Sequence, residues 1–153
     1  MARQSAGLLL YRRREGRIEV LLVHPGGPFG RKRDAGAWSV PKGEFTSEED
    51  PLDAARREFQ EETGLCAAGA FKPLEPVRQA GGKIVYAWAV EGDCDPEAIR
   101  SNLFSMEWPP GSGKIKEFPE VDRAEWFALE RAVEKIIGGQ RPLLEELGRL
   151  LGQ

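Results

Sequence analysis

The stretch between Gly43 and Leu65 fixes a helix by its ends and by the chemistry of its faces. Asp50 is typical of a helix N-cap, and Pro51 suits the first helical position, where an N–H would have no partner anyway. Gly64 is typical of a helix end. Apolar side chains recur between these signals at i, i+3 and i+7, namely Leu52, Ala55 and Phe59. The spacing predicts a helix whose apolar face packs onto a sheet.

A second face of the same helix is acidic. Glu58, Glu61 and Glu62 recur at i, i+3 and i+4, away from the apolar stripe. Clustered carboxylates repel one another, which raises their pKa values above about 4.3 unless a cation lies among them. Mg²⁺ and Mn²⁺ prefer oxygen ligands and often bridge carboxylates to substrate phosphates, so we expect one of these ions here. A solvated acidic face is the alternative, since isolated charge runs are usually of that kind.

Residues before and within the helix support such a site. Gly43 lets the backbone turn close to the acidic face, where its carbonyl can serve as a further metal ligand. Arg57 lies four residues before Glu61 and next to Glu58, and its planar fork can orient carboxylates, with Glu49 as an expected partner. The alternative for Arg57 is an ordinary surface ion pair with Glu61.

Residues 43–65 match the Nudix box, G-x5-E-x7-R-E-U-x-E-E-x-G-U with U apolar, at every defined position. The chain therefore resembles the Nudix hydrolase family. This resemblance implies an α/β fold, an α/β/α sandwich with a mixed sheet, here as a single domain over residues 1–153. It also implies a Mg²⁺- or Mn²⁺-dependent hydrolase of nucleoside diphosphates linked to another group. In the family, the carboxylates at the positions of Glu58, Glu61 and Glu62 bind metal.

The base that activates the water stays open between these glutamates and one from a later loop. Glu117, Glu120 and Glu125 are the later candidates, and we favour Glu120 as both extra ligand and base. The attacked phosphorus is also left open. His24 is the only histidine, so a zinc site or a serine–histidine triad is hard to build, and we expect it to be a packing residue.

Composition narrows the partners. The chain has 153 residues, 41% of them hydrophobic, and a net charge of −3, which argues against stable binding to nucleic acid or to anionic membranes. Cys66 and Cys94 have no metal-type spacing and are expected to be buried thiols. There is no secretory-type apolar start and no long apolar segment, so we expect a cytoplasmic monomer or homodimer.

Alternation and helical spacing outline the rest of the framework. The pattern predicts strands at 5–11, 17–23, 37–40, 83–90 and 124–127, a turn at 12–16, and helices starting at Leu129 and after Pro142. These elements are consistent with a mixed sheet covered by helices.

Two loops, at 24–34 and 108–114, are rich in basic, aromatic, glycine and proline residues. Arg31, Lys32 and Arg33 are candidates to bind a polyphosphate, and Lys42 is a further substrate-binding candidate. Phe29, Trp108 and Tyr86 are candidates to stack on a base. The alternative is a solvated basic tip with aromatic packing beneath it.

The substrate is the least constrained part of the interpretation. Residues 5–7, 38–43, 83–86 and the spacing from Glu120 to Trp126 are similar to the asymmetric diadenosine tetraphosphate hydrolase branch. The longer 24–36 loop and the 108–114 insertion depart from that branch. Because of the resemblance, dinucleoside polyphosphates are the first expected substrates. Oxidised nucleoside triphosphates are the next. A non-catalytic nucleotide-binding module is the alternative of another class, although the chain retains every glutamate of the box.

Overall fold

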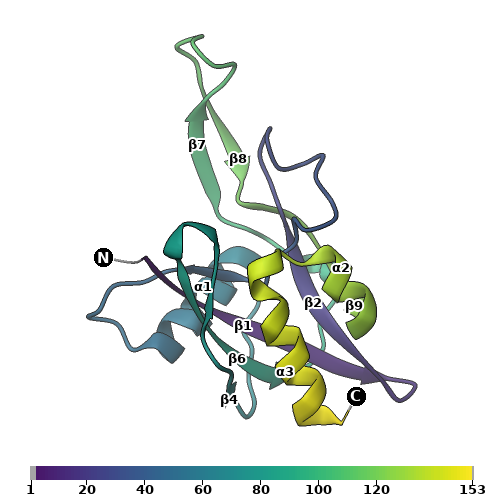
Figure 1. The fold of residues 1–153 in the computed structure, drawn as a ribbon. Coiled ribbons are helices and arrows are strands. Elements are labelled where there is room, and N and C mark those ends of the chain that lie inside the picture. Colours follow the sequence, from purple (N-terminus) through teal and green to yellow (C-terminus); the bar gives the residue numbers. More distant parts are fainter. Residues whose placement is uncertain (1–2, 153) are drawn as a thin grey trace.

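A mixed β-sheet forms the centre of the protein in the computed structural model, which describes residues 3–152 (Figure 1). The main path through the sheet runs through β4 (Lys72–Pro73), β6 (Ile84–Glu91), β1 (Gln4–Arg14), β2 (Arg17–Pro25) and β9 (Val121–Ala128). Two short strands lie off this path and pair with interior strands, β3 (Lys42–Glu44) with β1 and β5 (Val77–Arg78) with β6. β1 is parallel to β6 and antiparallel to β2, which makes the sheet mixed.

The first hairpin shows how the sequence sets the strand register. β1 extends through Arg14, and the turn consists of Glu15 and Gly16, both with positive φ. Two residues with positive φ form a tight turn whose twist matches that of the flanking strands. The predicted turn at 12–16 is therefore in the right place, but the arginines within it belong to the strands.

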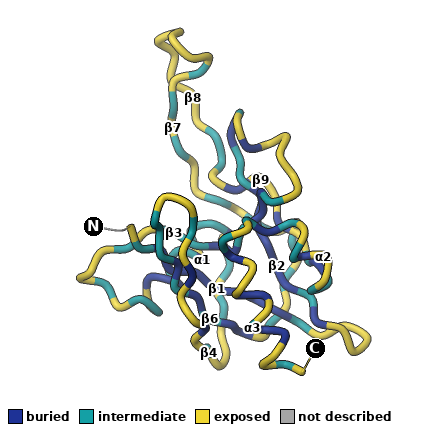
Figure 2. The backbone as a smooth tube through the Cα atoms, in the orientation of Figure 1, coloured by how far each residue is buried: buried dark blue, intermediate teal, exposed yellow. Residues whose placement is uncertain are grey.

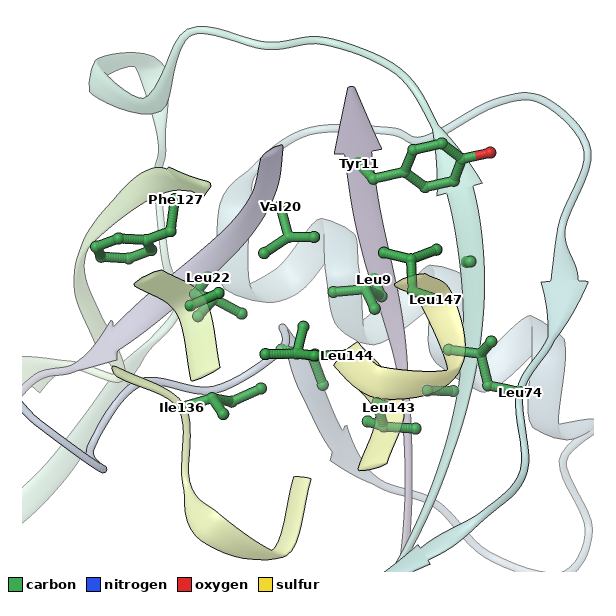
Figure 3. Packing of buried hydrophobic residues seen from close by; sticks show 14 of the residues in the cluster. Leu9, Tyr11, Val20, Leu22, Leu74, Phe127, Ile136, Leu143, Leu144 and Leu147 are labelled. Atoms are coloured by element: carbon green, nitrogen blue, oxygen red, sulfur yellow. The ribbon is translucent and has the colours of Figure 1, made fainter. Parts of the chain in front are cut away.

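Helices cover both faces of the sheet. α1 (Pro51–Thr63) packs on one face, where Ala54, Ala55 and Phe59 are buried with Leu8, Leu21 and other strand residues. α2 (Leu129–Lys135) and α3 (Arg141–Leu151) cover the other face (Figure 3). The strands between these layers are the most deeply buried part of the chain (Figure 2). The predicted α/β/α sandwich and its helices are confirmed.

A separate two-stranded sheet flanks the loop expected at 108–114, and its strands were not predicted from the sequence. β7 (Leu103–Glu107) and β8 (Ile115–Pro119) form an antiparallel hairpin that projects away from the sandwich (Figure 1). The 108–114 segment is its turn. No residue of this hairpin belongs to the buried clusters found among residues 3–152. Short 3-10 turns complete the described fold, at Ala80–Gly82, Pro96–Ala98 and Gly138–Gln140.

Two local expectations are wrong. Residues 37–40 do not form a strand, because Trp38 and Ser39 make only isolated bridges, to Ile136 and Val23. The segment is buried between β2 and the end of α2, which leaves no neighbouring strand along its length. Cys66 is exposed rather than buried because it follows the end of α1, and Cys94 is half-buried.

Candidate active site

The acidic face of α1 is positioned by the two ends of the helix. The Asp50 side chain accepts the Asp53 N–H, and Gly64, in the left-handed region, donates its own N–H to the Gln60 carbonyl. With the apolar face fixed on the sheet by Phe59, the three glutamates lie on the flank that faces β3 and the segment before it. Helix capping thus determines which side chains reach the candidate site.

Arg57 lies among three carboxylates. Its Nε and Nη2 donate to both oxygens of Glu49 at 3.0–3.1 Å. Its Nη1 donates to Glu58 at 2.8 Å and to Glu61 at 3.2 Å. This fork fixes the rotamers of the acidic face and ties the loop before α1 to the helix.

Gly43 forms a cradle for Glu58. A methyl group built on its Cα would collide with the Glu58 carboxylate, so this position accommodates glycine alone while that side chain stays in place. Burial raises the pKa of Glu58, and the charges of Glu61 and Glu120 add to this effect, while Arg57 opposes it. The backbone of β3 therefore lies directly against a carboxylate that is costly to ionise without a cation.

Glu62 and Lys42 are half-buried neighbours within the site. The Lys42 backbone N–H donates to Glu62 Oε1 at 3.1 Å. Burial raises the pKa of Glu62 to about 8, with further contributions from the charges of Glu120 and Glu58. Burial also lowers the pKa of the Lys42 amine, although the charge of Glu62 opposes the shift. The folded chain alone thus compensates a negative charge at Glu62 only in part.

Glu120 lies across a small cavity from Glu62. The cavity has a volume of about 160 Å³, and its lining includes Lys42, Glu62 and Glu120. Backbone bonds hold Glu120 there: its N–H donates to the Asn102 carbonyl and its carbonyl accepts the Gly26 N–H, both at 2.9 Å.

The other two late glutamates lie elsewhere. Glu117 is on β8 of the projecting hairpin, opposite Ser105. Glu125 lines a larger cavity of about 720 Å³ against β9, together with Arg100 and Trp126. Glu120 is thus the late glutamate that the fold brings to the acidic helix.

The oxygen atoms of these glutamates suit a hard dication such as Mg²⁺. In this conformation, however, some of the carboxylates are hydrogen-bonded to other residues of the chain. Arg57 occupies Glu58 and Glu61, and no group of three acidic, histidine or cysteine side chains within residues 3–152 is arranged as a ready metal cluster. The fit rests on oxygen donors, on the close approach at Gly43 and on the buried Glu62, whose ionised form needs a positive neighbour. These residues would hold the metal.

The predicted substrate-binding residues lie in three different parts of the fold, the loop after β2, strand β3 and strand β6. Arg31, Lys32 and Arg33 are all exposed on the loop after β2. Tyr86 lies on β6, where its ring contacts Phe45 at a centroid distance of 5.9 Å. Lys42 alone lies within the carboxylate cluster. His24 is fully buried, with Nδ1 bonded to Asp122 at 2.8 Å, in agreement with a packing role.

One supporting segment was missed by sequence reasoning. Residues 100–102 connect the end of α1 to the projecting hairpin: the N–H groups of Arg100 and Asn102 donate to the carbonyls of Thr63 and Glu61 at 2.8 and 2.9 Å. Ser101 accepts the Val121 N–H through its side chain at 3.0 Å. Most of these contacts are made by backbone atoms, so the residue types in the sequence do not predict them.

An α/β/α sandwich in which a glutamate-rich helix packs against the strand that contains Gly43 is the arrangement expected of a hydrolase that cleaves pyrophosphate bonds. Residues 1–147 match the sequence profile described as NUDIX domain, and the chain belongs to this family of hydrolases. It is 35% identical to the RNA pyrophosphohydrolase of Bartonella henselae over 145 residues, covering 84% of this chain and 77% of that protein. The RNA pyrophosphohydrolase of Brucella anthropi is 32% identical over 127 residues, covering 72% and 67% of the two chains.

Solved structures show the same fold. The Ap4A hydrolase of C. elegans, in a binary complex, superposes with a TM-score of 0.68 at 24% identity, over 99% of this chain and 98% of the other. The NUDIX domain of Shewanella oneidensis NrtR, complexed with ADP ribose, has a TM-score of 0.66 at 15% identity, over 100% and 90%. Among the described residues, no helix is long and apolar enough to cross a membrane.

Proposed function

We propose that this chain hydrolyses a pyrophosphate bond in a nucleotide linked to a further group, with Mg²⁺ or Mn²⁺ bound at the acidic face of α1. The observation that carries this proposal is the convergence of Glu58, Glu62 and Glu120 on the backbone of Lys42 and Gly43. Three ionised carboxylates in a partly buried site are costly unless cations share it, and bound cations would in turn attract a substrate phosphate.

Each residue has a proposed role. Glu58, Glu61, Glu62 and Glu120 would hold the metal, together with the Gly43 carbonyl. The bound metal supplies charge neutralisation for the diphosphate and a water of lowered pKa. Arg57 would orient Glu58 and Glu61 through its hydrogen bonds, and Lys42, which lines the same cavity as Glu62 and Glu120, would bind a substrate phosphate. A carboxylate not engaged by metal accepts the proton from the attacking water, with Glu120, Glu58 and Glu61 as the candidates.

Two kinds of extended nucleotide are the leading substrates. Dinucleoside polyphosphates follow from the sequence resemblance described above. RNA with a 5′-terminal pyrophosphate follows from the RNA pyrophosphohydrolases of Bartonella henselae and Brucella anthropi, each more than 30% identical to this chain. Oxidised nucleoside triphosphates stay a further alternative, as does a binding module without turnover. We also propose that the protein is cytoplasmic and that it is a monomer or a homodimer. Light scattering measures the mass in solution and so distinguishes a monomer from a dimer.

A substrate panel tests the reaction and separates an enzyme from a binding module. The wild-type protein is incubated with Mg²⁺ and diadenosine polyphosphates, 5′-triphosphorylated RNA, or oxidised and ordinary nucleoside triphosphates, and the products are separated by chromatography. We expect release of a phosphate-containing product from at least one extended substrate, and its identity gives the point of cleavage. Saturable binding without any product would contradict the proposal.

The variant Glu62→Gln tests the role of the carboxylate in the same panel. Glutamine retains an oxygen that accepts the Lys42 N–H but carries no charge, so the local fold is preserved. We expect turnover to fall about a hundred-fold or more, since one metal ligand loses its charge. Near-normal turnover would exclude Glu62 from the metal site.

A further inference from the structure

Exposed apolar side chains are concentrated around the projecting hairpin. Four large apolar residues are exposed within residues 3–152: Phe29 at 67%, Ile115 at 68%, Leu103 at 58% and Leu150 at 52%. Phe29 lies on the loop after β2, whereas Leu103 and Ile115 lie on the hairpin. The loop and the hairpin thus both carry apolar side chains that are exposed to solvent and lie away from the core.

The two sides of the hairpin differ in charge and in chemistry. The register pairs Phe104 with Phe118 and Met106 with Lys116, and the Trp108 N–H continues the ladder to the Lys114 carbonyl at 2.9 Å. Because side chains alternate along a strand, these residues share one side, which is aromatic and basic. The opposite side carries Leu103, Ser105, Glu107, Ile115 and Glu117.

The basic and aromatic side of the hairpin faces the loop after β2. The ring of Phe29 meets the ring of Trp108 edge to face at a centroid distance of 5.4 Å. Gly27 lies beneath Phe104, where a Cβ atom would collide with the ring. We call Phe29, Arg31, Lys32 and Arg33 of the loop, with Trp108, Lys114 and Lys116 of the hairpin, the platform. Its aromatic rings and exposed cations come from segments far apart in the sequence.

The base of the platform is fixed to the candidate active site. Gly26 donates its N–H to the Glu120 carbonyl at 2.9 Å, directly between the loop and the hairpin. His24 ties the start of the loop to Asp122 on β9. The path from Glu120 to the tip runs along five residues of β8, which at about 3.4 Å per residue spans roughly 17 Å. The base of the platform is therefore tied to the candidate active site by hydrogen bonds, and a single nucleotide at the acidic helix would fall short of the hairpin tip.

We propose that the platform binds the part of an extended substrate that lies beyond the cleaved pyrophosphate, a second nucleotide with its base and phosphate. This rests on the proposed hydrolysis and assigns its substrate class. Stacking of a base on Phe29 and pairing of phosphate with the exposed cations explain this combination of side chains better than a second protein copy does. Lysine is depleted from protein contacts, and three of the five platform cations are lysines, Lys32, Lys114 and Lys116. The acidic net charge of the chain is no obstacle because the cations are local.

A length series of substrates tests this assignment. Values of kcat/KM are measured for a nucleoside triphosphate and for 5′-triphosphorylated oligoribonucleotides of increasing length, with diadenosine polyphosphates as a second arm. We expect kcat/KM to rise with length by about five-fold or more, because stacking of one base contributes about 1 kcal/mol at least. The arm that shows the rise identifies RNA or a dinucleotide as the source of the second nucleotide.

Matched variants locate the effect. Phe29→Ala should remove the gain with length, whereas Ile115→Ala, equally exposed on the opposite side of the hairpin, should retain it. Lys32→Ala/Arg33→Ala should lower kcat/KM for long substrates more than Arg13→Ala/Arg14→Ala, which removes the same charge from the β1–β2 hairpin at another end of the molecule (Figure 1).

The possible results separate the two proposals. Hydrolysis without any dependence on length, or equal effects of Phe29→Ala and Ile115→Ala, would overturn the platform while leaving the proposed function intact. A complete lack of product from every substrate would overturn the proposed function itself. In that case, the affinities of the wild type and of Phe29→Ala for a fluorescent oligonucleotide would still test whether the platform binds a nucleotide. Equal affinity of these two proteins for the oligonucleotide would also contradict it.

Discussion

At the scale of single residues, the candidate site combines carboxylates that are expensive to ionise with partners that hold them in place. Glu62 is buried, with its pKa raised to about 8, yet its oxygen accepts the Lys42 N–H. Arg57 compensates Glu49, Glu58 and Glu61 but does not bond to Glu62. The site is therefore short of positive charge around Glu62, which is the property expected of a site that binds a metal ion.

The variant Gly43→Ala tests the contact between β3 and the acidic helix. Its Cβ atom would displace the end of the Glu58 side chain, which can move at little cost to the fold. We expect turnover to fall about ten- to a hundred-fold while the midpoint of thermal unfolding changes little, because a carboxylate would be misplaced by about an ångström. Kinetics and calorimetry on the same sample measure both effects.

Gly138→Ala is the matched control for this prediction. Nothing lies within 4 Å of a Cβ atom at Gly138, and its φ is not positive. Its turnover should equal that of the wild type. Full activity of Gly43→Ala would show that the position of Glu58 does not matter for the reaction.

At the scale of elements, α1 carries the catalytic candidates only as long as its apolar face stays on the sheet. Phe59 is 1% exposed and is the largest side chain that the helix buries. Phe59→Ala should lower the free energy of unfolding by about 3 to 5 kcal/mol, as expected for a large cavity in a core. Denaturant titration measures this change. The exposed Gln60 provides the control: Gln60→Ala should change stability by less than about 0.5 kcal/mol, and similar losses for both would contradict the packing described.

The loop after β2 is fastened at its far end by Asp34. Its carboxylate accepts bonds from Lys135 Nζ at 2.5 Å and from Trp38 Nε1 at 2.9 Å. These bonds hold the pKa of Asp34 below its ordinary value of 3.8. A carboxyl whose pKa is lowered by folding stabilises the fold above its unfolded pKa, and this contribution is lost as the pH falls through the folded pKa.

The stabilising effect of Asp34 should therefore depend on pH in a defined direction. Asp34→Asn should unfold at a lower temperature than the wild type near neutral pH, and the difference should shrink below about pH 4. Thermal unfolding followed by circular dichroism at several pH values measures the difference. A difference that stays constant into the acidic range would show that the ion pair contributes nothing to stability.

The elements that the sequence predicts well are those whose boundaries are local. Helix α1 begins and ends as its proline and glycine indicate, because capping depends on neighbouring residues alone. The prediction of a short strand at 37–40 is wrong because an apolar run can also pack, without strand pairing, between two elements, here β2 and the end of α2. β7 alternates in exposure but β8 does not, and the intervening residues 108–114 contain prolines and glycines. Their pairing is therefore seen only in the folded register. The position of Glu120 likewise depends on distant backbone bonds.

At the scale of the whole molecule, the sandwich and the projecting hairpin behave as separable parts. The hairpin contributes nothing to the buried clusters of the described chain, whereas its base is bonded to the end of α1 and to the loop after β2. The sandwich positions the acidic helix, and in our proposal the hairpin extends the surface for a long substrate. Such a division would allow specificity to change without altering the site.

Shortening the hairpin tests this division. Replacing residues 107–115 by Asn-Gly joins Met106 to its partner Lys116 through a tight turn and leaves the base near Glu120 unchanged. We expect the midpoint of thermal unfolding and the hydrolysis of a nucleoside triphosphate to stay close to wild type, while the preference for extended substrates is lost. Loss of folding in this variant would contradict the separation of hairpin and core.

The central claim is that the acidic face of α1, with Glu120, holds dications beside a pyrophosphate. Electron paramagnetic resonance measures it directly, by counting free Mn²⁺ during titration of the wild type and of Glu62→Gln, with and without a non-hydrolysable nucleotide. We expect uptake of Mn²⁺ by the wild type, competition by Mg²⁺, and clearly weaker uptake by the variant. Absence of uptake by the wild type, even with the nucleotide present, would contradict it.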